Sequence, residues 1–432
     1  MSASLSKRPG KYIRSYDRFY GIMRSQVNRA QSGIITPQMR AVAAAEGITA
    51  ASLRDRIADG SSVIMNRGKR AIGIGRGLST KINVNIGTST GRISVDDEIR
   101  KARIAEEFGA DTISDLSMGG DIPEIRKAIM AATTLPVTTV PIYETAATKG
   151  LGEMTADDII ATIRAQAEQG VSSFVVHCVN DAMLSVFRKK KRILGVVSKG
   201  GSITSAYMLL NRCGNPFIEN FDEVLAICRE HDIVLSLGNT ARSGCIGDRR
   251  DRAQVEEARL NIALARRAHD SGVQVIIEGC GGHISIDRIP SSIRYYKKTA
   301  DFPLFVAGPL PTDIAAGYDH IAGCAGASVA SAAGADYLCY ITPAEHLGLP
   351  TPDAVKEGLI AFRIAAHIGD TVKYKDRSTR QDETIARLRA DLDREGQIRC
   401  ALNPARAREL SDGEKECTMC GEFCAIKIMR EF

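Results

Sequence analysis

The sequence predicts an α/β fold: a (βα)8 barrel of the TIM type, flanked by a helical N-terminal region and a C-terminal tail of helices and clustered cysteines. Short apolar or β-branched runs recur eight times between Asn83 and Gly308, and a polar, glycine-containing turn follows each run. Segments with helical spacing alternate with these runs, which indicates a parallel sheet covered on its outer face. A doubly wound open sheet is the main alternative.

The expected strands are short and mostly aliphatic or β-branched. They cover residues 82–88, 111–117, 137–143, 173–179, 194–200, 233–239, 273–279 and 303–309. The clearest helical segments between them cover residues 94–110, 155–170, 220–232 and 251–272. The first two helical segments open with serine or threonine followed by acidic residues, which are the residue types that cap a helix N-terminus and complement its dipole.

Polar residues follow the expected strands at their C-terminal ends. These residues are Asn85, Asp115, Tyr143, His177, Ser198 with Lys199, Asn239 and Glu278. Any one of them alone is more simply a turn or capping residue. In a (βα)8 barrel, however, the C-terminal ends of all strands converge on one mouth, where the active site lies. The series therefore predicts an active site at that mouth.

The chain divides into three parts by its patterns. We expect a mainly helical region at 1–82, a catalytic barrel at 83–350, and C-terminal helices with a cysteine tail at 351–432. Gly73, Gly75 and Gly77 do not follow a convincing strand with the spacing of a dinucleotide-binding loop, so we expect no cofactor there.

Composition restricts the classes of protein. Residues are 44% hydrophobic, which suffices for large cores, and no run approaches the roughly 20 apolar residues of a membrane helix. Eleven cysteines, an odd number, and an N-terminus without an apolar signal segment indicate a reducing cytoplasm. The net charge of +6 suits a phosphate-bearing substrate. The basic residues between Lys7 and Arg29 favour a solvated face or a tail on a partner subunit over a nucleic-acid arm.

Three cysteines lie within eight residues near the C-terminus: Cys417, Cys420 and Cys424. A structural zinc site needs four ligands, and no fourth cysteine or histidine lies nearby. A [4Fe-4S] cluster with three protein ligands leaves one iron free for a small chelating molecule such as S-adenosylmethionine. The spacing therefore favours a cluster, with zinc and a distant fourth ligand as the alternative. His283 and His346 have no ligand spacing, and each is more simply an ordinary polar histidine.

Several motifs occur together along almost the whole chain. They are "NVNIGTS", "GADTISDLS", "TVPIYE", "GVVSKGGS", "LSLGNTARSG", "GPLPTDIAAGYDH", "LCYITPAEHLGLP" and "CTMCGEFCAIKI". With these motifs the chain resembles the phosphomethylpyrimidine synthase family of thiamine biosynthesis. The resemblance implies a barrel, a homodimer with a swapped [4Fe-4S] tail, and radical S-adenosylmethionine chemistry on 5-aminoimidazole ribotide. It also implies a reductant such as flavodoxin or ferredoxin.

The resemblance further implies which residues form the site. Substrate contacts would fall on Asn85, Ser114, Tyr143, His177, Ser198, Lys199, Gly200, Asn239, Thr240, Ala241, Arg242, Glu278 and Phe305. His177 and Glu278 would orient substrate or move protons. A divalent metal, zinc by the family pattern, would bind His283 and His346, and the cluster would bind the three tail cysteines. Neither a nucleic acid nor a membrane is an expected partner.

The chain departs from the family motifs mainly in the substrate pocket. Ser114 replaces a methionine, Lys199 an arginine, Asn239 an aspartate and Phe305 a tyrosine, while the "EGCGGH" segment has one residue more than Glu-Gly-Pro-Gly-His. Lysine offers a point charge where arginine offers a planar fork.

These changes favour a different product from the same substrate, namely that of the paralogous 5-hydroxybenzimidazole synthase of anaerobic cobalamin lower-ligand biosynthesis. Phosphomethylpyrimidine synthase is the first alternative. A non-catalytic zinc- or nucleic-acid-binding module is the second.

Overall fold

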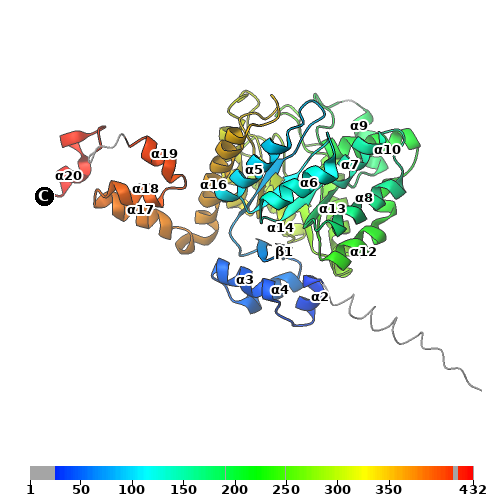
Figure 1. The fold of residues 1–432 in the computed structure, drawn as a ribbon, viewed down its shortest axis with the longest axis horizontal. Helices are drawn as coiled ribbons and strands as arrows, with labels where there is room; N and C mark the ends of the chain where they lie inside the picture. The colour runs from blue at the N-terminus through cyan, green and yellow to red at the C-terminus, as the bar shows by residue number, and fades with distance from the viewer. Residues whose placement is uncertain (1–24, 190, 249, 412–416, 432) are drawn as a thin grey trace, which may run out of the picture.

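The computed structural model describes residues 25–189, 191–248, 250–411 and 417–431. Its centre is a closed barrel of eight parallel strands in the order β10-β3-β4-β5-β6-β7-β8-β9, which confirms the predicted fold class (Figure 1). The strands are β3 (Lys81–Ile86), β4 (Thr112–Asp115), β5 (Val137–Thr139), β6 (Ser173–Val176), β7 (Val234–Leu237), β8 (Val275–Glu278), β9 (Leu304–Ala307) and β10 (Tyr337–Cys339). The open-sheet alternative is excluded because β10 pairs with β3 and closes the sheet.

Helices surround the barrel, and the sequence caps several of them. They are α5 (Val95–Glu107), α6 (Ile122–Ala132), α7 (Pro141–Lys149), α8 (Ala156–Glu168), α9 (Asp181–Arg188), α10 (Lys199–Asn211), α11 (Pro216–Glu219), α12 (Phe221–His231), α13 (Arg252–Asp270), α14 (Ile289–Thr299) and α15 (Asp319–Ala333). The Thr155 side chain caps α8 and forms a reciprocal capping box with Asp158. The expected caps at Ser94 and Thr155 are therefore both present.

One predicted strand is wrong. Residues 194–200 form no strand; they are a loop that ends at Ser198, the N-cap of α10. The eighth strand is instead β10, beyond the expected end of the barrel strands at Gly308. The apolar run at 194–200 resembles a strand because the loop carries exposed Leu194 and Val197, which are 54% and 37% exposed. Tyr143, expected at a strand end, lies in α7.

The N-terminal region contains a β-hairpin that the helical expectation did not include. It follows α2 (Gln26–Gln31), α3 (Pro37–Glu46) and α4 (Ala50–Ala58), and comprises antiparallel β1 (Ser62–Arg67) and β2 (Arg70–Gly75). Val63, Met65 and Ile74 of the hairpin pack with Val234 and Ile276 of the barrel. The hairpin therefore covers the N-terminal end of the barrel. The predicted basic residues from Lys7 to Arg24 lie outside the described residues.

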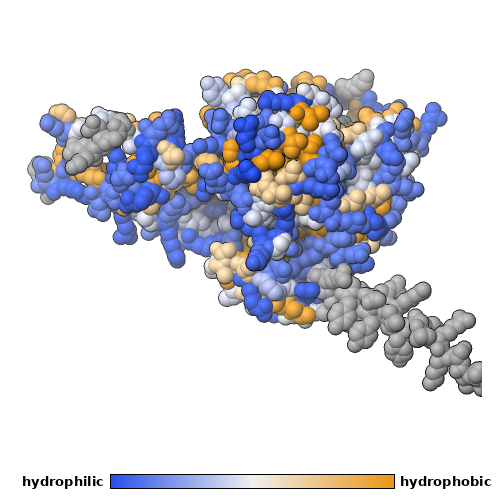
Figure 2. All heavy atoms as spheres, in the orientation of Figure 1, coloured by the Kyte–Doolittle hydropathy of each residue, from blue (hydrophilic) through white to orange (hydrophobic). Residues whose placement is uncertain are grey.

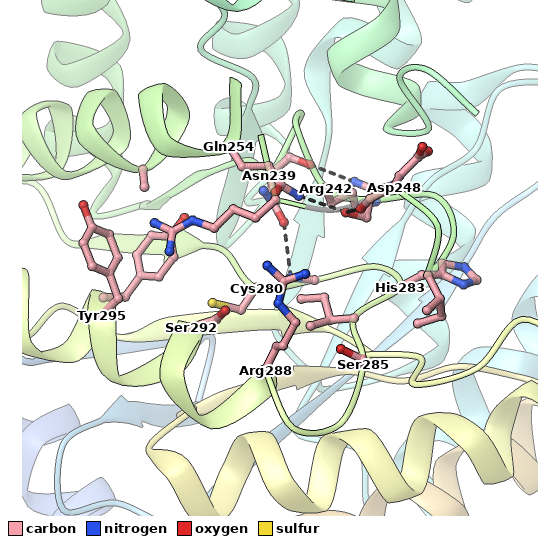
Figure 3. A pocket seen from close by; sticks show the side chains of 17 residues that line it. Asn239, Arg242, Asp248, Gln254, Cys280, His283, Ser285, Arg288, Ser292 and Tyr295 are labelled. Carbon is pink, nitrogen blue, oxygen red and sulfur yellow. Dashed lines mark hydrogen bonds between the residues drawn. The ribbon is translucent and has the colours of Figure 1, made fainter. Parts of the chain in front are cut away.

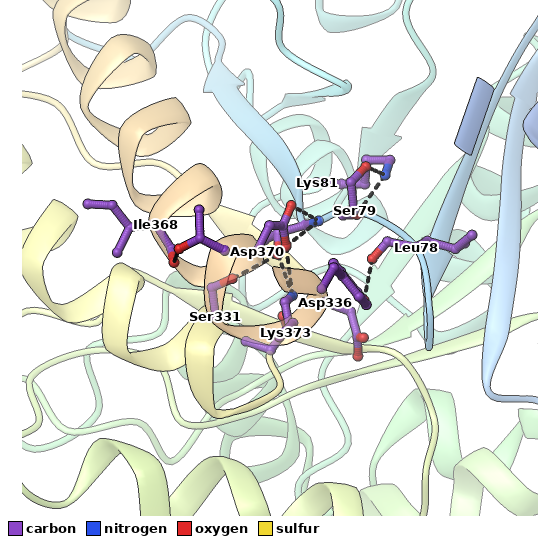
Figure 4. A network of polar contacts seen from close by, with 12 residues as sticks. Leu78, Ser79, Lys81, Ser331, Asp336, Ile368, Asp370 and Lys373 are labelled. Atoms are coloured by element: carbon purple, nitrogen blue, oxygen red, sulfur yellow. Dashed lines mark hydrogen bonds and ion pairs between the residues drawn. The ribbon is translucent and has the colours of Figure 1, made fainter. Parts of the chain in front are cut away.

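A buried polar network joins the C-terminal helix α16 (Pro352–Tyr374) to the barrel (Figure 4). The Asp370 carboxylate accepts hydrogen bonds from the Thr80 amide at 3.0 Å and the Thr80 hydroxyl at 2.6 Å, just before β3. Lys373 donates to the Ala335 carbonyl at 3.0 Å, just before β10. A Cβ at Gly369 would lie 2.0 Å from the Ser331 hydroxyl, so only glycine permits this close approach of α16 to α15.

The remaining C-terminal elements lie beyond α16, beside the barrel (Figure 1). They are η1 (Lys375–Arg377), α17 (Arg380–Ala390), α18 (Arg394–Cys400), α19 (Pro404–Glu409), η2 (Gly421–Phe423) and α20 (Ala425–Met429). The face in Figure 2 is largely hydrophilic with separate apolar patches. Among the described residues, no helix has the length and apolar character to cross a membrane.

Candidate active site

A cavity at the C-terminal mouth of the barrel, here called the mouth cavity, gathers most of the predicted substrate residues. It contains about 630 Å³ of empty space, counting the part open to solvent. Its predicted members are Asn85, Ser114, Tyr143, His177, Ser198, Asn239, Arg242, Glu278 and Phe305. Lys199, Gly200, Thr240 and Ala241 flank these residues in the chain but do not line the cavity. Side chains from β3, β4, β8 and β9 and from four loops or helices thus meet at one place.

Cys339, which the sequence analysis did not include, lies at the wall of the mouth cavity. The Asn85 amide nitrogen lies 3.0 Å from the Cys339 sulfur, and burial raises the pKa of this thiol to about 12. The Ser114 hydroxyl donates to the Asn83 side-chain oxygen at 3.0 Å. Asn83, in turn, fixes Asn85 through a 2.8 Å hydrogen bond, so these strand-end groups form one buried polar layer.

His177 follows β6 and is buried against two glycines. Burial and the nearby Arg242 guanidinium lower the pKa of His177 to about 3, which keeps its imidazole neutral at physiological pH. Its Nδ1 atom is buried and has no hydrogen-bond partner among the described residues. A Cβ at Gly200 would lie 2.4 Å from the imidazole, and one at Gly238 would lie 2.8 Å from it. The ring is therefore tightly held, and its buried Nδ1 lies against Gly200.

The loop before α10 combines a cap and a cation. The Ser198 hydroxyl accepts a hydrogen bond from the Gly201 amide at 3.1 Å and so begins the helix. Lys199 lies with its ammonium 5.2 Å from the centroid of the Tyr143 ring, and partial burial lowers the pKa of Lys199. Burial raises the pKa of Tyr143 to about 12, so its hydroxyl stays protonated. The cation and the phenol thus lie together at one side of the mouth.

The loop after β7 is organised by Glu257 of α13, a residue that the sequence analysis missed. Its carboxylate accepts hydrogen bonds from the Asn239 amide at 2.5 Å, the Ala241 backbone amide at 3.0 Å and the Thr240 backbone amide. The Arg242 guanidinium donates to the Asn239 carbonyl at 3.1 Å. Burial, which outweighs these hydrogen bonds, raises the pKa of Glu257 to about 7. Glu257 therefore sets the shape of the loop that presents Asn239 and Arg242.

Glu278 ends β8 and faces the same cavity. Its carboxylate accepts hydrogen bonds from the Ser236 hydroxyl at 2.9 Å and the Asn239 backbone amide at 3.4 Å. Burial raises the pKa of Glu278, although Ser236 and Arg242 oppose that effect. Phe305 stacks on Tyr337 with ring centroids 4.0 Å apart and gives the cavity an apolar wall. Glu278 is thus a carboxyl group that could hold or release a proton beside a ligand.

His283 and His346 lie side by side, although they are far apart in sequence. Their ring centroids are 5.2 Å apart. The Nδ1 atom of His283 lies 2.6 Å from the Asp313 carboxylate, and that of His346 lies 3.4 Å from Asp319. In metal sites, a histidine commonly donates its other ring N–H to a carboxylate. This pair, with Nδ1 engaged on both rings and Nε2 free to bind, fits a divalent metal that takes further ligands from elsewhere.

The three tail cysteines lie in one short turn. Cys417 accepts a backbone hydrogen bond from Gly421 at 3.2 Å, and Cys420 accepts one from Phe423 at 3.0 Å. All three thiols are free, and Cys417 and Cys420 are exposed. The donor set and the compact turn fit an iron-sulfur cluster. In the described part of the chain no three metal-binding side chains converge, so cluster binding requires the three thiols to draw together.

The residues that the sequence analysis missed act through tertiary contacts. Glu257 and Asp319 lie in helices α13 and α15, and Asp313 lies in the loop after β9, where acidic residues are usually solvated. Cys339 lies in the strand that was not expected. Only the motif "LCYITP" could have indicated it, because it begins with a short continuous apolar run like that of a buried strand.

The fold and the mouth cavity define a TIM-barrel enzyme. A model of the "Radical SAM ThiC family" matches residues 25–431, and the chain belongs to that family. A [4Fe-4S] cluster and S-adenosylmethionine are the cofactors that membership implies.

Relatives match along nearly the whole chain. Phosphomethylpyrimidine synthase of Dehalococcoides mccartyi strain CBDB1 is 45% identical over 419 residues, covering 94% of this chain and 97% of its own. Phosphomethylpyrimidine synthase 1 of Methanosarcina mazei is 45% identical over 414 residues, covering 93% and 96%. A solved dihydropteroate synthase of Thermus thermophilus aligns over 70% of this chain and 98% of its own at 13% identity, with a TM-score of 0.40. The barrel assignment rests on the strand pairing described above.

Proposed function

We propose that this chain is a phosphomethylpyrimidine synthase, which converts 5-aminoimidazole ribotide to a pyrimidine phosphate. The observation that carries the proposal is the mouth cavity, which is lined by neutral His177, Glu278, Tyr143 and Arg242. The chain that forms this cavity belongs to a family of radical enzymes. Relatives at 45% identity bear the name of that synthase. The comparisons favour this product over 5-hydroxybenzimidazole, which the sequence motifs favoured.

The chain's own residues would bind and orient the ribotide. Arg242 and Lys199 give the mouth positive charge, which suits a phosphate-bearing substrate. Neutral His177 lines the mouth cavity and can hydrogen-bond the ribotide, and Glu278 can hold a proton beside the ring. Cys417, Cys420 and Cys424 would hold the cluster, which with S-adenosylmethionine supplies one-electron chemistry. We propose a reduced flavodoxin or ferredoxin as the electron source.

We also propose that His283 and His346 hold zinc or a similar divalent cation. The carboxylates of Asp313 and Asp319 on their Nδ1 atoms support this role. Such a cation would bind a ligand group above the mouth.

We also propose that the protein is a homodimer whose two chains exchange their cysteine tails. The tail lies beyond α16 in Figure 1, and none of its cysteines lines the mouth cavity of the same chain. A second copy could bring its tail to this mouth. Eleven free thiols suit the reducing cytoplasm in which we expect the protein to work.

5-Hydroxybenzimidazole synthase is the second candidate, and a specific observation favours it. Three of the four residues that depart from the family motifs, Ser114, Asn239 and Phe305, line the mouth cavity itself. The fourth, Lys199, lies over Tyr143, which also lines it. Changes at the cavity wall alter how a substrate lies, and hence which bonds rearrange.

One experiment separates the candidates. The anaerobically reconstituted protein is incubated with 5-aminoimidazole ribotide, S-adenosylmethionine and dithionite, and the products are identified by mass spectrometry. The pyrimidine phosphate is the expected product. 5-Hydroxybenzimidazole as the main product would establish the second candidate, and the absence of 5'-deoxyadenosine would contradict both.

A further inference from the structure

Figure 3 shows a second cavity, here called the side pocket. It is formed by the loops after β7 and β8 and by α14, and it contains about 710 Å³ of empty space, counting the part open to solvent. Asn239 and Arg242 line both cavities, so the two cavities meet at Arg242. A group bound in the side pocket would therefore be connected to the active site.

The lining of the side pocket is strongly cationic. Arg242, Arg250 and Arg288 all line it. Neither the Arg250 nor the Arg288 guanidinium has a hydrogen-bond or ion-pair partner within the described ranges, although Arg250 lies 5.3 Å from the centroid of the Tyr295 ring. The one carboxylate in the lining, that of Asp248, is engaged with the Ile193 backbone amide at 2.6 Å. The pocket thus has three arginines in its lining against one carboxylate.

The wall of the side pocket coincides with a departure from the family motif. The loop after β8 carries the extra residue of "EGCGGH", and Cys280 in that loop has a φ of 57°, which is uncommon for a residue with a side chain. The Asn239 side-chain oxygen accepts from the Gly281 amide at 3.3 Å and ties this loop to the loop after β7. The lengthened loop and Asn239 therefore shape the pocket together.

We propose that the side pocket is a phosphate-binding subsite of the active site. Guanidinium groups bind phosphate through paired N–H donors, and three arginines line this pocket, whereas Lys199 at the start of α10 offers a single point charge. Ser285 and Ser292 add hydroxyl donors to the lining. A role of the side pocket in turnover rests on the proposed function, because the proposed ribotide substrate carries a phosphate ester. The phosphate is either that ester or free phosphate.

Calorimetric titration of the full-length protein tests the subsite, with inorganic phosphate in one arm and ribose 5-phosphate in the other at fixed ionic strength. We expect Arg250→Ala and Arg288→Ala each to weaken phosphate binding by about tenfold, because each removes a charge-assisted contact. Both side chains are exposed, so the variants should fold. Arg294→Ala is the matched control, since Arg294 lies on α14, which begins directly after Arg288, but outside the pocket. The affinity of this variant should equal that of the wild type.

The two arms identify the source of the phosphate. Weaker binding of both ligands in the variants assigns the subsite to the substrate ester, and weaker binding of inorganic phosphate alone assigns it to free phosphate. Wild-type affinity in both variants, loss of binding only in Lys199→Ala, or no binding by the wild type would each overturn the proposal. No cluster or S-adenosylmethionine is needed, so a protein that binds phosphate through Arg288 but makes no pyrimidine would refute only the proposed function.

Discussion

The carboxylate of Glu257 lies 2.5 Å from the Asn239 amide nitrogen and also accepts hydrogen bonds from two backbone amides of the same loop. A carboxylate at position 239 would place two buried acids in direct contact, with strong mutual repulsion. The amide at Asn239 is therefore suited to this buried carboxylate, and its oxygen remains free to bind the Gly281 amide.

Glu257→Gln should destabilise the protein by about 1–3 kcal/mol, because a buried amide cannot accept from all three donors. Burial raises the pKa of Glu257 from 4.5 to about 7, so the folded state binds this proton more tightly than the unfolded chain. The stability of the wild type relative to the variant should consequently fall as pH rises from about 4.5 to about 7. Urea denaturation at several pH values measures both effects. Glu256→Gln, which retains an acceptor for Asn180, should change little.

His177 should remain neutral in the folded protein across the range from pH 5 to 9, given its pKa of about 3. Because the unfolded chain binds this proton more readily, the stability that His177 contributes is complete above about 6.5 and is lost as pH falls toward 3. Nitrogen-15 NMR of the imidazoles, with His177→Gln to identify the signal, would show this directly. A cationic imidazole at pH 7 would contradict the hydrogen-bonding role proposed for it.

Gly200→Ala should destabilise the protein by about 1–3 kcal/mol, since the new Cβ would overlap the tightly packed His177 ring. The thermal midpoint and the affinity for ribotide should both fall. Gly152→Ala is the control, because nothing lies within 4 Å of its new Cβ. Equal stability of the two variants would show that the ring can move aside.

His283→Ala and His346→Ala should each abolish binding of a divalent metal, measured by mass spectrometry of the desalted protein. Asp313→Asn should weaken it by about 10- to 100-fold, the usual effect of losing a carboxylate on a ligating histidine. His367→Ala removes a histidine that pairs with Asp382 on the surface and should retain the metal. Full metal content in His283→Ala would show that the histidine pair does not bind the metal.

Cys420→Ala should lose the visible absorbance and the stoichiometric iron and sulfide of the reconstituted cluster, because only two thiolates would remain. Cys213→Ala, which removes an exposed thiol elsewhere, should retain them. An intact cluster in Cys420→Ala would exclude the three-cysteine ligand set.

The sequence predicted the barrel because seven of its strands are short aliphatic or β-branched runs that alternate with helical segments. It misassigned residues 194–200 because a run of apolar residues in an exposed loop has the same composition as a buried strand. It missed β10 because Tyr337–Cys339 has no β-branched residue, whereas the equally short β5 consists of three. The side-chain partners of the site, such as Glu257 and Asp313, could not be predicted at all, since only the folded chain brings a helix carboxylate to a loop many residues away.

The hairpin of β1 and β2 affects how substrates enter the enzyme and how products leave it. Its apolar side chains fill the end of the barrel opposite the mouth, so reactants and products in the described part of the molecule share one route. Whatever covers that route during a reaction has to withdraw before the next molecule enters. The pace of turnover would then be governed by this uncovering as much as by bond breaking.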